Sequence, residues 1–175
     1  LIGENGAGKT TLMNILGGVL QPDAGEIRFG GEKRVFSVPK DSLNAGIAFI
    51  HQELNLVNDL NVYENLFLGR ELKKAGRIDR KAMIARSNDV FGRLKVELNP
   101  ETPLRALDAS YKQIVEIARA LLFDAKLIIM DEPTTSLTEV EIERVFDMMR
   151  AVKKTGVSMV FISHKLGEVL EICDR

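Results

Sequence analysis

The feature that most constrains this chain is a glycine-rich stretch near its start, Gly3-Glu4-Asn5-Gly6-Ala7-Gly8-Lys9-Thr10. It fits the pattern G-x-x-x-x-G-K-[ST], in which glycines let the backbone turn so that amide N–H groups point inward. Such amides, together with the positive end of the next helix, form a concave site for anions. The stretch therefore predicts a phosphate-binding loop that follows a strand at Leu1-Ile2 and opens a helix at about Lys9.

The residue types at the end of this loop predict roles toward a nucleotide. We expect the Lys9 ammonium to face the β- and γ-phosphates and the Thr10 hydroxyl to bind Mg²⁺. Thr11, one residue further into the helix, can reach the α-phosphate side. The alternative is an ordinary glycine-rich turn that Lys and Thr follow by chance. The rest of the chain helps to decide between a phosphate-binding loop and such a turn.

Three apolar segments further along, at 47–50, 126–130 and 157–162, predict buried strands. Ligands of open parallel sheets bind just beyond the carboxyl ends of the strands. Polar residues found there include Gln52, Asp131, Glu132 and His164. We expect Gln52 and Asp131 to lie beside Mg²⁺, Glu132 to polarise the attacking water, and His164 to bond a γ-phosphate. Singly, each is more simply an ordinary residue at a strand end, but together they predict a nucleotide-hydrolysing site.

The order of segments predicts an α/β fold with a mostly parallel sheet flanked by helices. Residues 26–36 predict a small antiparallel hairpin, and helices are expected at 79–95 and 139–154. Residues 70–115 carry many charges and predict a helical insertion with no strand of its own.

Composition excludes some classes of function. The net charge of −1 argues against general binding of polyanions, so no nucleic-acid partner is expected. The single cysteine, Cys173, permits no internal disulfide, which favours the cytosol. The chain starts inside a predicted strand and stops after a predicted helix, so we expect it to be a fragment.

The order of phosphate loop, Gln after a strand, helical insertion, Asp-Glu and Ser-His resembles the ATP-binding domain of ABC transporters. Stretches 53–57, 62–71, 131–138 and 162–166 resemble the first of two fused ATP-binding domains in bacterial monosaccharide importers of the ribose, galactose and arabinose kind.

The resemblance implies a P-loop NTPase fold, with one ATP-binding domain over 1–175 and a helical subdomain at about 70–115. It implies ATP and Mg²⁺ as ligands, Thr10, Gln52 and Asp131 at the metal, Glu132 as catalytic base and His164 as γ-phosphate sensor. The implied partners are a second ATP-binding cassette, transmembrane permease subunits and, through them, a periplasmic or extracellular sugar-binding protein. The implied location is the cytoplasmic face of the cell membrane, as a peripheral protein.

This chain departs from the family pattern in two places. The segment that should read Leu-Ser-Gly-Gly-Gln is Leu107-Asp108-Ala109-Ser110-Tyr111, and Thr138 stands where an Asp is usual. Both departures concern contacts across a cassette dimer. One hypothesis is that Asp108 repels the γ-phosphate on the partner cassette; the other is that Asp108 or Ser110 caps the helix that begins near Tyr111.

Two other classes of function stay open from the sequence. A soluble ABC-type ATPase of DNA repair or of the ribosome would share the phosphate loop and Asp131-Glu132, but usually has a longer insertion and basic surfaces. A nucleotide-binding module without hydrolysis would not need Glu132.

Overall fold

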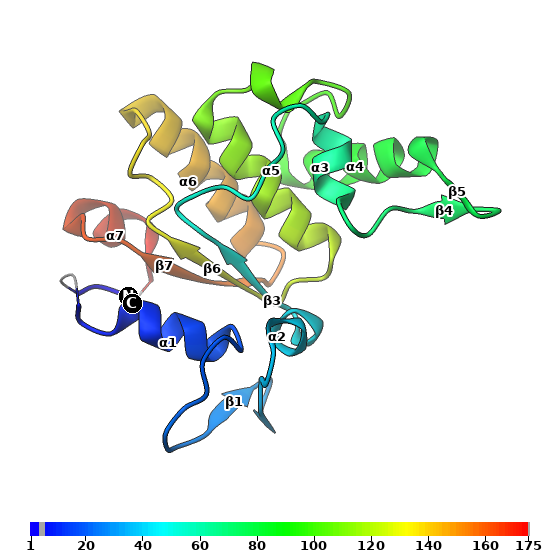
Figure 1. Ribbon diagram of the computed structural model, residues 1–175. Helices are drawn as coiled ribbons and strands as arrows, with labels where there is room; N and C mark the ends of the chain where they lie inside the picture. Colours follow the sequence, from blue (N-terminus) through cyan, green and yellow to red (C-terminus); the bar gives the residue numbers. More distant parts are fainter. Residues whose placement is uncertain (4–5, 175) are drawn as a thin grey trace.

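A three-stranded parallel sheet forms the centre of the protein (Figure 1). The structure is a computed structural model, and it describes residues 1–3 and 6–174. The strands are β3 (Ile47–Ile50), β6 (Leu127–Asp131) and β7 (Ser158–Ile162), in the order β3-β6-β7. Ile50 pairs with Met130, and Asp131 pairs with Ile162. This confirms the predicted mostly parallel α/β sheet. Glu4 and Asn5, two predicted members of the phosphate loop, lie outside the described residues.

Helices cover both faces of this sheet, with α1 on one side and α5 and α6 on the other (Figure 1). The helices are α1 (Lys9–Leu16), α2 (Pro39–Ala45), α3 (Val62–Phe67), α4 (Arg80–Leu94), α5 (Ala109–Leu122), α6 (Glu139–Lys153) and α7 (Leu166–Ile172), with a 3₁₀ turn at Leu104–Ala106. Alternate strand residues enter two cores, as the period of a strand requires. Ile129 packs in the core beside α1, whereas Ile128 and Met130 pack in the larger core beneath α5 and α6.

The predicted strand at Leu1-Ile2 is wrong for this structure. Neither residue belongs to a strand, although the Leu1 amino group donates to the Phe161 carbonyl at 2.7 Å. One hydrogen bond places this segment beside β7 but does not make a ladder, since a strand needs repeated pairing.

The predicted hairpin at 26–36 is present as β1 (Ile27–Phe29) and β2 (Glu32–Arg34), which pair antiparallel. The region at 70–115 does contain a strand pair, contrary to prediction: β4 (Lys73–Lys74) and β5 (Arg77–Ile78) form a short hairpin. Ala75 and Gly76 join them with φ of 50° and 78°. Positive φ at both central residues is the turn that matches strand twist.

The helices of this region pack with helices that begin before it and end after it. Its main helix begins where expected, because the Asp79 carboxylate caps α4 by accepting from the Ala82 N–H at 3.0 Å. The helix α3 precedes residue 70 and packs against α4 and α5, while α5 continues past residue 115. The helices α3, α4 and α5 therefore form one packed group.

We expect Gly18→Ala to destabilise the fold. Gly18 has a φ of 71°, and a Cβ there would lie 2.6 Å from the Val38 carbonyl oxygen. A left-handed conformation costs a non-glycine residue roughly 1–2 kcal/mol, and the clash adds to this. Each kcal/mol lowers the melting temperature of a domain this size by about 2–4 °C.

The matched control is Gly92→Ala within α4, where an added Cβ meets no atom within 4 Å. Replacing an interior helical glycine by alanine should stabilise by roughly 0.5–1 kcal/mol. Circular dichroism melts of both variants measure the contrast, and equal melting temperatures would contradict the role given to Gly18.

Candidate functional site

A cleft of about 620 Å³ opens where the carboxyl ends of the central strands meet the start of α1. Its lining contains all but one of the described residues that the sequence predicted for the phosphate loop, the metal and catalysis: Gly3, Gly6, Gly8, Lys9, Thr10, Thr11, Gln52, Asp131, Glu132 and His164. Ala7 does not line it; a Cβ on Gly3 would lie 3.2 Å from the Ala7 Cβ, so these two residues pack closely. The sheet thus brings together side chains that are far apart in the sequence.

The glycine-rich loop has a backbone that suits an anion. Gly6 and Gly8 have φ of 84° and 86°, where L-residues are strained. Gly8 stands at the N-cap of α1, and no side chain in the described part of the chain caps this helix. The first amides of α1 therefore face the cleft without a side-chain acceptor, which is the arrangement that binds phosphate.

Lys9 adds a positive charge to the same loop. Its Nζ donates to the Gly3 carbonyl at 2.6 Å, so the side chain folds back across the loop. Thr10 follows in the first turn of α1 and lines the cleft together with Gln52 and Asp131. A hydroxyl, an amide oxygen and a carboxylate are hard oxygen ligands of the kind that Mg²⁺ accepts with water. The donor set therefore fits a magnesium–nucleotide complex.

Glu132 and His164 form a hydrogen-bonded pair at the edge of the cleft. The His164 Nδ1 lies 3.0 Å from Glu132 Oε1, and the Thr135 hydroxyl donates to Glu132 Oε2 at 3.2 Å. The hydrogen bond from His164 is the main cause that lowers the pKa of Glu132, with burial acting in the opposite direction. This hydrogen bond therefore favours the ionised carboxylate, and it leaves the other ring nitrogen of His164, Nε2, outside the pair.

The backbone of Glu132 is unusual. Its φ is 47°, and its N–H donates to the Ile162 carbonyl at 2.9 Å, one residue beyond the end of β6. Left-handed backbone at a non-glycine residue persists where the surroundings hold it, and such residues gather at functional sites. Sequence pattern predicted the residue but not this conformation.

A hydrogen-bond network that the sequence did not predict connects the loops that carry this pair. The Glu168 carboxylate, on α7, accepts from the hydroxyls of Thr134 at 2.5 Å and Ser163 at 3.2 Å. Lys165 Nζ donates to its other oxygen at 3.0 Å. The contacts join the loop after Glu132 to the loop that carries His164. A glutamate in the first turn of a helix is common, so the sequence offered no separate signal for it.

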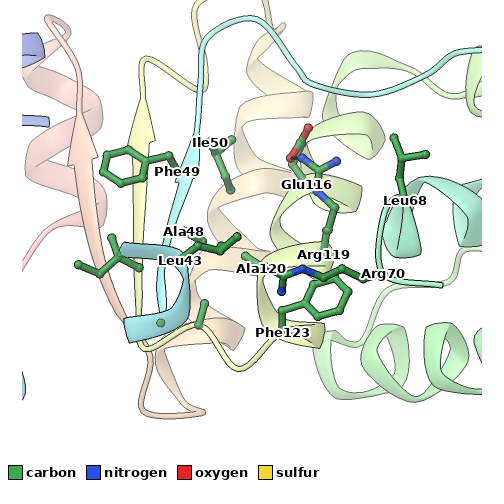
Figure 2. Close-up of a pocket in the computed structure, with 13 residues that line it drawn as sticks. Leu43, Ala48, Phe49, Ile50, Leu68, Arg70, Glu116, Arg119, Ala120 and Phe123 are labelled. Atoms are coloured by element: carbon green, nitrogen blue, oxygen red, sulfur yellow. Dashed lines mark hydrogen bonds and ion pairs between the residues drawn. The ribbon is translucent and has the colours of Figure 1, made fainter. Parts of the chain in front are cut away.

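A second cavity, of about 260 Å³, lies between β3 and α5 and was also missed (Figure 2). Its walls are mainly apolar, but Glu116 and Arg119 of α5 enter it (Figure 2). Glu116, only 3% exposed, accepts from Arg119 at 2.5 Å, and Arg119 donates to the Asn55 carbonyl at 3.0 Å. Burial raises the pKa of Glu116, while Arg119 acts to lower it. The pair ties the segment that follows Gln52 to α5.

The predicted signature segment, 107–111, does not line the cleft of its own chain. Asp108 caps α5: its Oδ1 accepts from the Tyr111 N–H at 2.9 Å and from the Ser110 hydroxyl at 2.7 Å. Arg144 of α6 donates to Asp108 Oδ2 at 3.0 Å and lies 4.7 Å from the centre of the Tyr111 ring. The capping arrangement is therefore present, whereas repulsion of a partner's phosphate stays a prediction.

Thr138, the other departure from the family pattern, begins α6. Its N–H and hydroxyl donate to Glu141 at 2.9 and 2.8 Å. The bond from the N–H to the residue three positions ahead is the glutamate half of a capping box. A threonine here thus has a structural use at the start of the helix.

We expect Asp108→Ala to lower the melting temperature at neutral pH. Loss of an N-cap costs roughly 1 kcal/mol, or about 2–4 °C here, whereas Asp108→Ser keeps a capping oxygen and should lose less. Burial favours the neutral carboxyl, but hydrogen bonds from Tyr111, Ser110 and Arg144 outweigh it and lower the Asp108 pKa.

The direction of that shift sets the pH dependence. A carboxyl whose pKa is lowered on folding stabilises the fold above its unfolded pKa, and this stabilisation disappears as the pH falls through the folded pKa. The difference between wild type and Asp108→Ala should therefore shrink below about pH 4. A difference that stays constant down to pH 2 would contradict the charged cap.

This chain is similar in sequence to known ATP-binding proteins of ABC transporters. A family model described as ABC transporter matches residues 1–135. The chain is 51% identical over its whole length to the ribose import ATP-binding protein RbsA of Bacillus licheniformis, and covers 36% of that protein. It is 46% identical to the galactose/methyl galactoside import ATP-binding protein MglA of Treponema denticola, again over 100% of this chain and 35% of the relative. The chain thus spans about a third of the length of these curated relatives.

Solved structures give the same comparison in three dimensions. The ATP-binding cassette MJ1267 in its ADP conformation superposes with a TM-score of 0.84 at 27% identity, covering 99% of this chain and 72% of that chain. A nucleotide-free ATP-binding cassette from an ABC transporter superposes with a TM-score of 0.78 at 25% identity, with the same coverage. Among the described residues, no helix has the length and apolar character needed to cross a membrane.

Proposed function

Because the chain belongs to the ABC transporter family, we propose that it binds and hydrolyses ATP to power the import of a monosaccharide. Membership of this family confirms the resemblance read from the sequence, and it implies ATP binding. The observation that carries the proposal is the cleft, where a glycine-rich loop and Lys9 lie with Gln52, Asp131, Glu132 and His164.

In this proposal the phosphates lie on the loop. Amides of the glycine-rich loop and the start of α1 donate to phosphate oxygens, and Lys9 neutralises their charge. Thr10, Gln52 and Asp131 would hold Mg²⁺, which when bound neutralises charge on the phosphates and orients them. Ala7 and the undescribed Glu4 and Asn5 belong to this loop by sequence alone.

The hydrolytic step uses the pair at the edge of the cleft. Glu132, held ionised, accepts a proton from the attacking water and so acts as general base. With both ring nitrogens protonated, His164 would donate from Nδ1 to Glu132 and from Nε2 to the γ-phosphate, and so stabilise the charge that develops there. The contact between the two side chains supports the proposal that they act together.

The proposed substrate class is a monosaccharide, because relatives at about half identity are named for import of ribose and of galactose or methyl galactoside. The sugar itself would be selected by partner proteins. We propose as partners a second ATP-binding cassette, transmembrane permease subunits and, through the permease, a sugar-binding protein. The chain would then work as a peripheral protein on the cytoplasmic face of the membrane.

Lys9→Ala should weaken ATP binding by about ten- to a hundredfold, since a hydrogen bond to a charged group is worth roughly 1.5–3 kcal/mol. The measurement is equilibrium titration of the purified full-length protein with a fluorescent ATP analogue. Lys40→Ala, at an exposed lysine outside the cleft, is the control and should bind as wild type does. An equal affinity of Lys9→Ala and wild type for the ATP analogue would contradict the phosphate-binding role of the loop.

Glu132→Gln should keep ATP binding and lose hydrolysis, because an amide cannot accept the proton from water. General-base catalysis contributes roughly a hundredfold or more, so turnover at this site should fall at least that far. The assay follows phosphate release by the full-length protein in membrane vesicles with its natural permease, with and without the sugar. Glu139→Gln at the exposed start of α6 is the matched control; residual activity above about a tenth in Glu132→Gln would exclude the base assignment.

A further inference from the structure

We propose that Glu168 is a positioning residue that holds Glu132 and His164 in contact by joining the two loops that carry them. The inference rests on the proposed function, since it concerns how the hydrolytic pair is aligned. Glu168 itself does not line the cleft, so it acts through other residues.

The first step of the argument is the position of its partners. Thr134 lies two residues after Glu132, and Ser163 lies immediately before His164. Both hydroxyls donate to the same oxygen, Glu168 Oε2, at 2.5 and 3.2 Å. One carboxylate oxygen thus connects the loop that follows β6 to the loop that follows β7.

The second step is burial. Thr134 is 1% exposed and Ser163 is 2% exposed, so neither hydroxyl can turn to bulk water if its acceptor is removed. A buried polar group that is left without a hydrogen-bond partner destabilises the folded state. With two buried donors on one acceptor, the loops would rearrange when Glu168 is removed.

The third step is the charge on the carboxylate. Lys165 Nζ donates to Glu168 Oε1 at 3.0 Å, so the second oxygen is also engaged. The Lys165 N–H donates in turn to the Ser163 hydroxyl at 3.0 Å. His164 therefore has a residue on each side that is bonded into the same network.

The fourth step is the strained backbone of Glu132. Its φ of 47° needs surroundings that hold it. On one side the Glu132 N–H is bonded to the Ile162 carbonyl, and on the other the chain is fixed at Thr134 by Glu168. Release of Thr134 frees one side of that constraint and moves the carboxylate relative to the imidazole.

The test compares Glu168→Ala, Glu168→Gln and Glu171→Ala in the full-length protein with its natural permease. Glu171 is the matched control because it lies on the same helix and pairs with Arg150 at 2.9 Å, away from both loops. A misplacement of about 1 Å can lower a rate by up to a hundredfold. We expect Glu168→Ala to lower kcat by about ten- to a hundredfold with KM nearly unchanged, because the phosphate loop is untouched.

Glu168→Gln should recover most of kcat, since its amide oxygen still accepts from Thr134 and Ser163. Glu171→Ala should behave as wild type. Equal losses in the alanine and glutamine variants of Glu168 would point to the Lys165 ion pair and overturn the loop-joining role.

A double-mutant cycle separates positioning from a general structural role. If Glu168 aligns the pair, adding Glu168→Ala to His164→Ala should lower kcat by clearly less than Glu168→Ala does in the wild type, as coupled residues are not additive. Full additivity of the two losses would overturn the proposal. Thr134→Val and Ser163→Ala each remove one bond and replace Glu168→Ala if that variant does not fold.

A second readout does not depend on catalysis. Hydrogen exchange of the Lys165 amide in nucleotide-free protein should be faster in Glu168→Ala than in wild type and unchanged in Glu171→Ala. Absence of ATP hydrolysis in the wild type would contradict the proposed function alone. Unchanged exchange at Lys165 in Glu168→Ala would contradict the positioning role alone.

Discussion

The register of β6 between β3 and β7 is the constraint on which the site depends. Ile47 pairs with Leu127 at one end, and Asp131 pairs with Ile162 at the other. A slip of one residue would exchange the faces of Ile128 and Ile129, which belong to different cores, and both sets of buried contacts would be lost. The apolar residues of β6 therefore determine where Asp131 and Glu132 lie. The cleft results from core packing, and its polar residues take the positions that the packing leaves at the strand ends.

The loops around the cleft carry backbone and polar groups that reduce stability. Glu132 has a positive φ, which is costly for a residue with a side chain. Nearby hydroxyls of Thr134 and Ser163 are buried and depend on one carboxylate. These unfavourable features persist because the hydrophobic cores on both faces of the sheet stabilise the fold enough to offset them. They also explain why the site is sensitive to residues outside the cleft: a loop held by few hydrogen bonds moves when one of them is removed.

Much of this could be predicted from sequence, for reasons that differ between residues. Asp131 and Glu132 follow four apolar residues, so their strand and its end are unambiguous, and Asp79 is a clear cap before an amphipathic helix. The β4-β5 hairpin was missed because Lys73, Lys74 and Arg77 show no apolar alternation. Only the Ala75-Gly76 turn indicates that hairpin, and its strands are exposed. Glu116, Arg119, Arg144 and Glu168 were missed because their roles depend on tertiary neighbours rather than on spacing along one element.

The contacts of Asp108 change how its charge should be treated. An unpaired carboxylate about 4 Å from a phosphate would be repelled by roughly 1 kcal/mol in water and 4 kcal/mol at an effective dielectric of 20. Asp108 is instead paired with Arg144 at 3.0 Å and bonded to the amide of Tyr111, so its charge is balanced locally. An approaching anion would meet the field of both the carboxylate and the guanidinium, which largely cancel at distances beyond their separation. The same carboxylate accepts from the Tyr111 amide at the start of α5, as a capping serine at this position would also do. We therefore expect Asp108 to repel a partner's phosphate less than an unpaired carboxylate would.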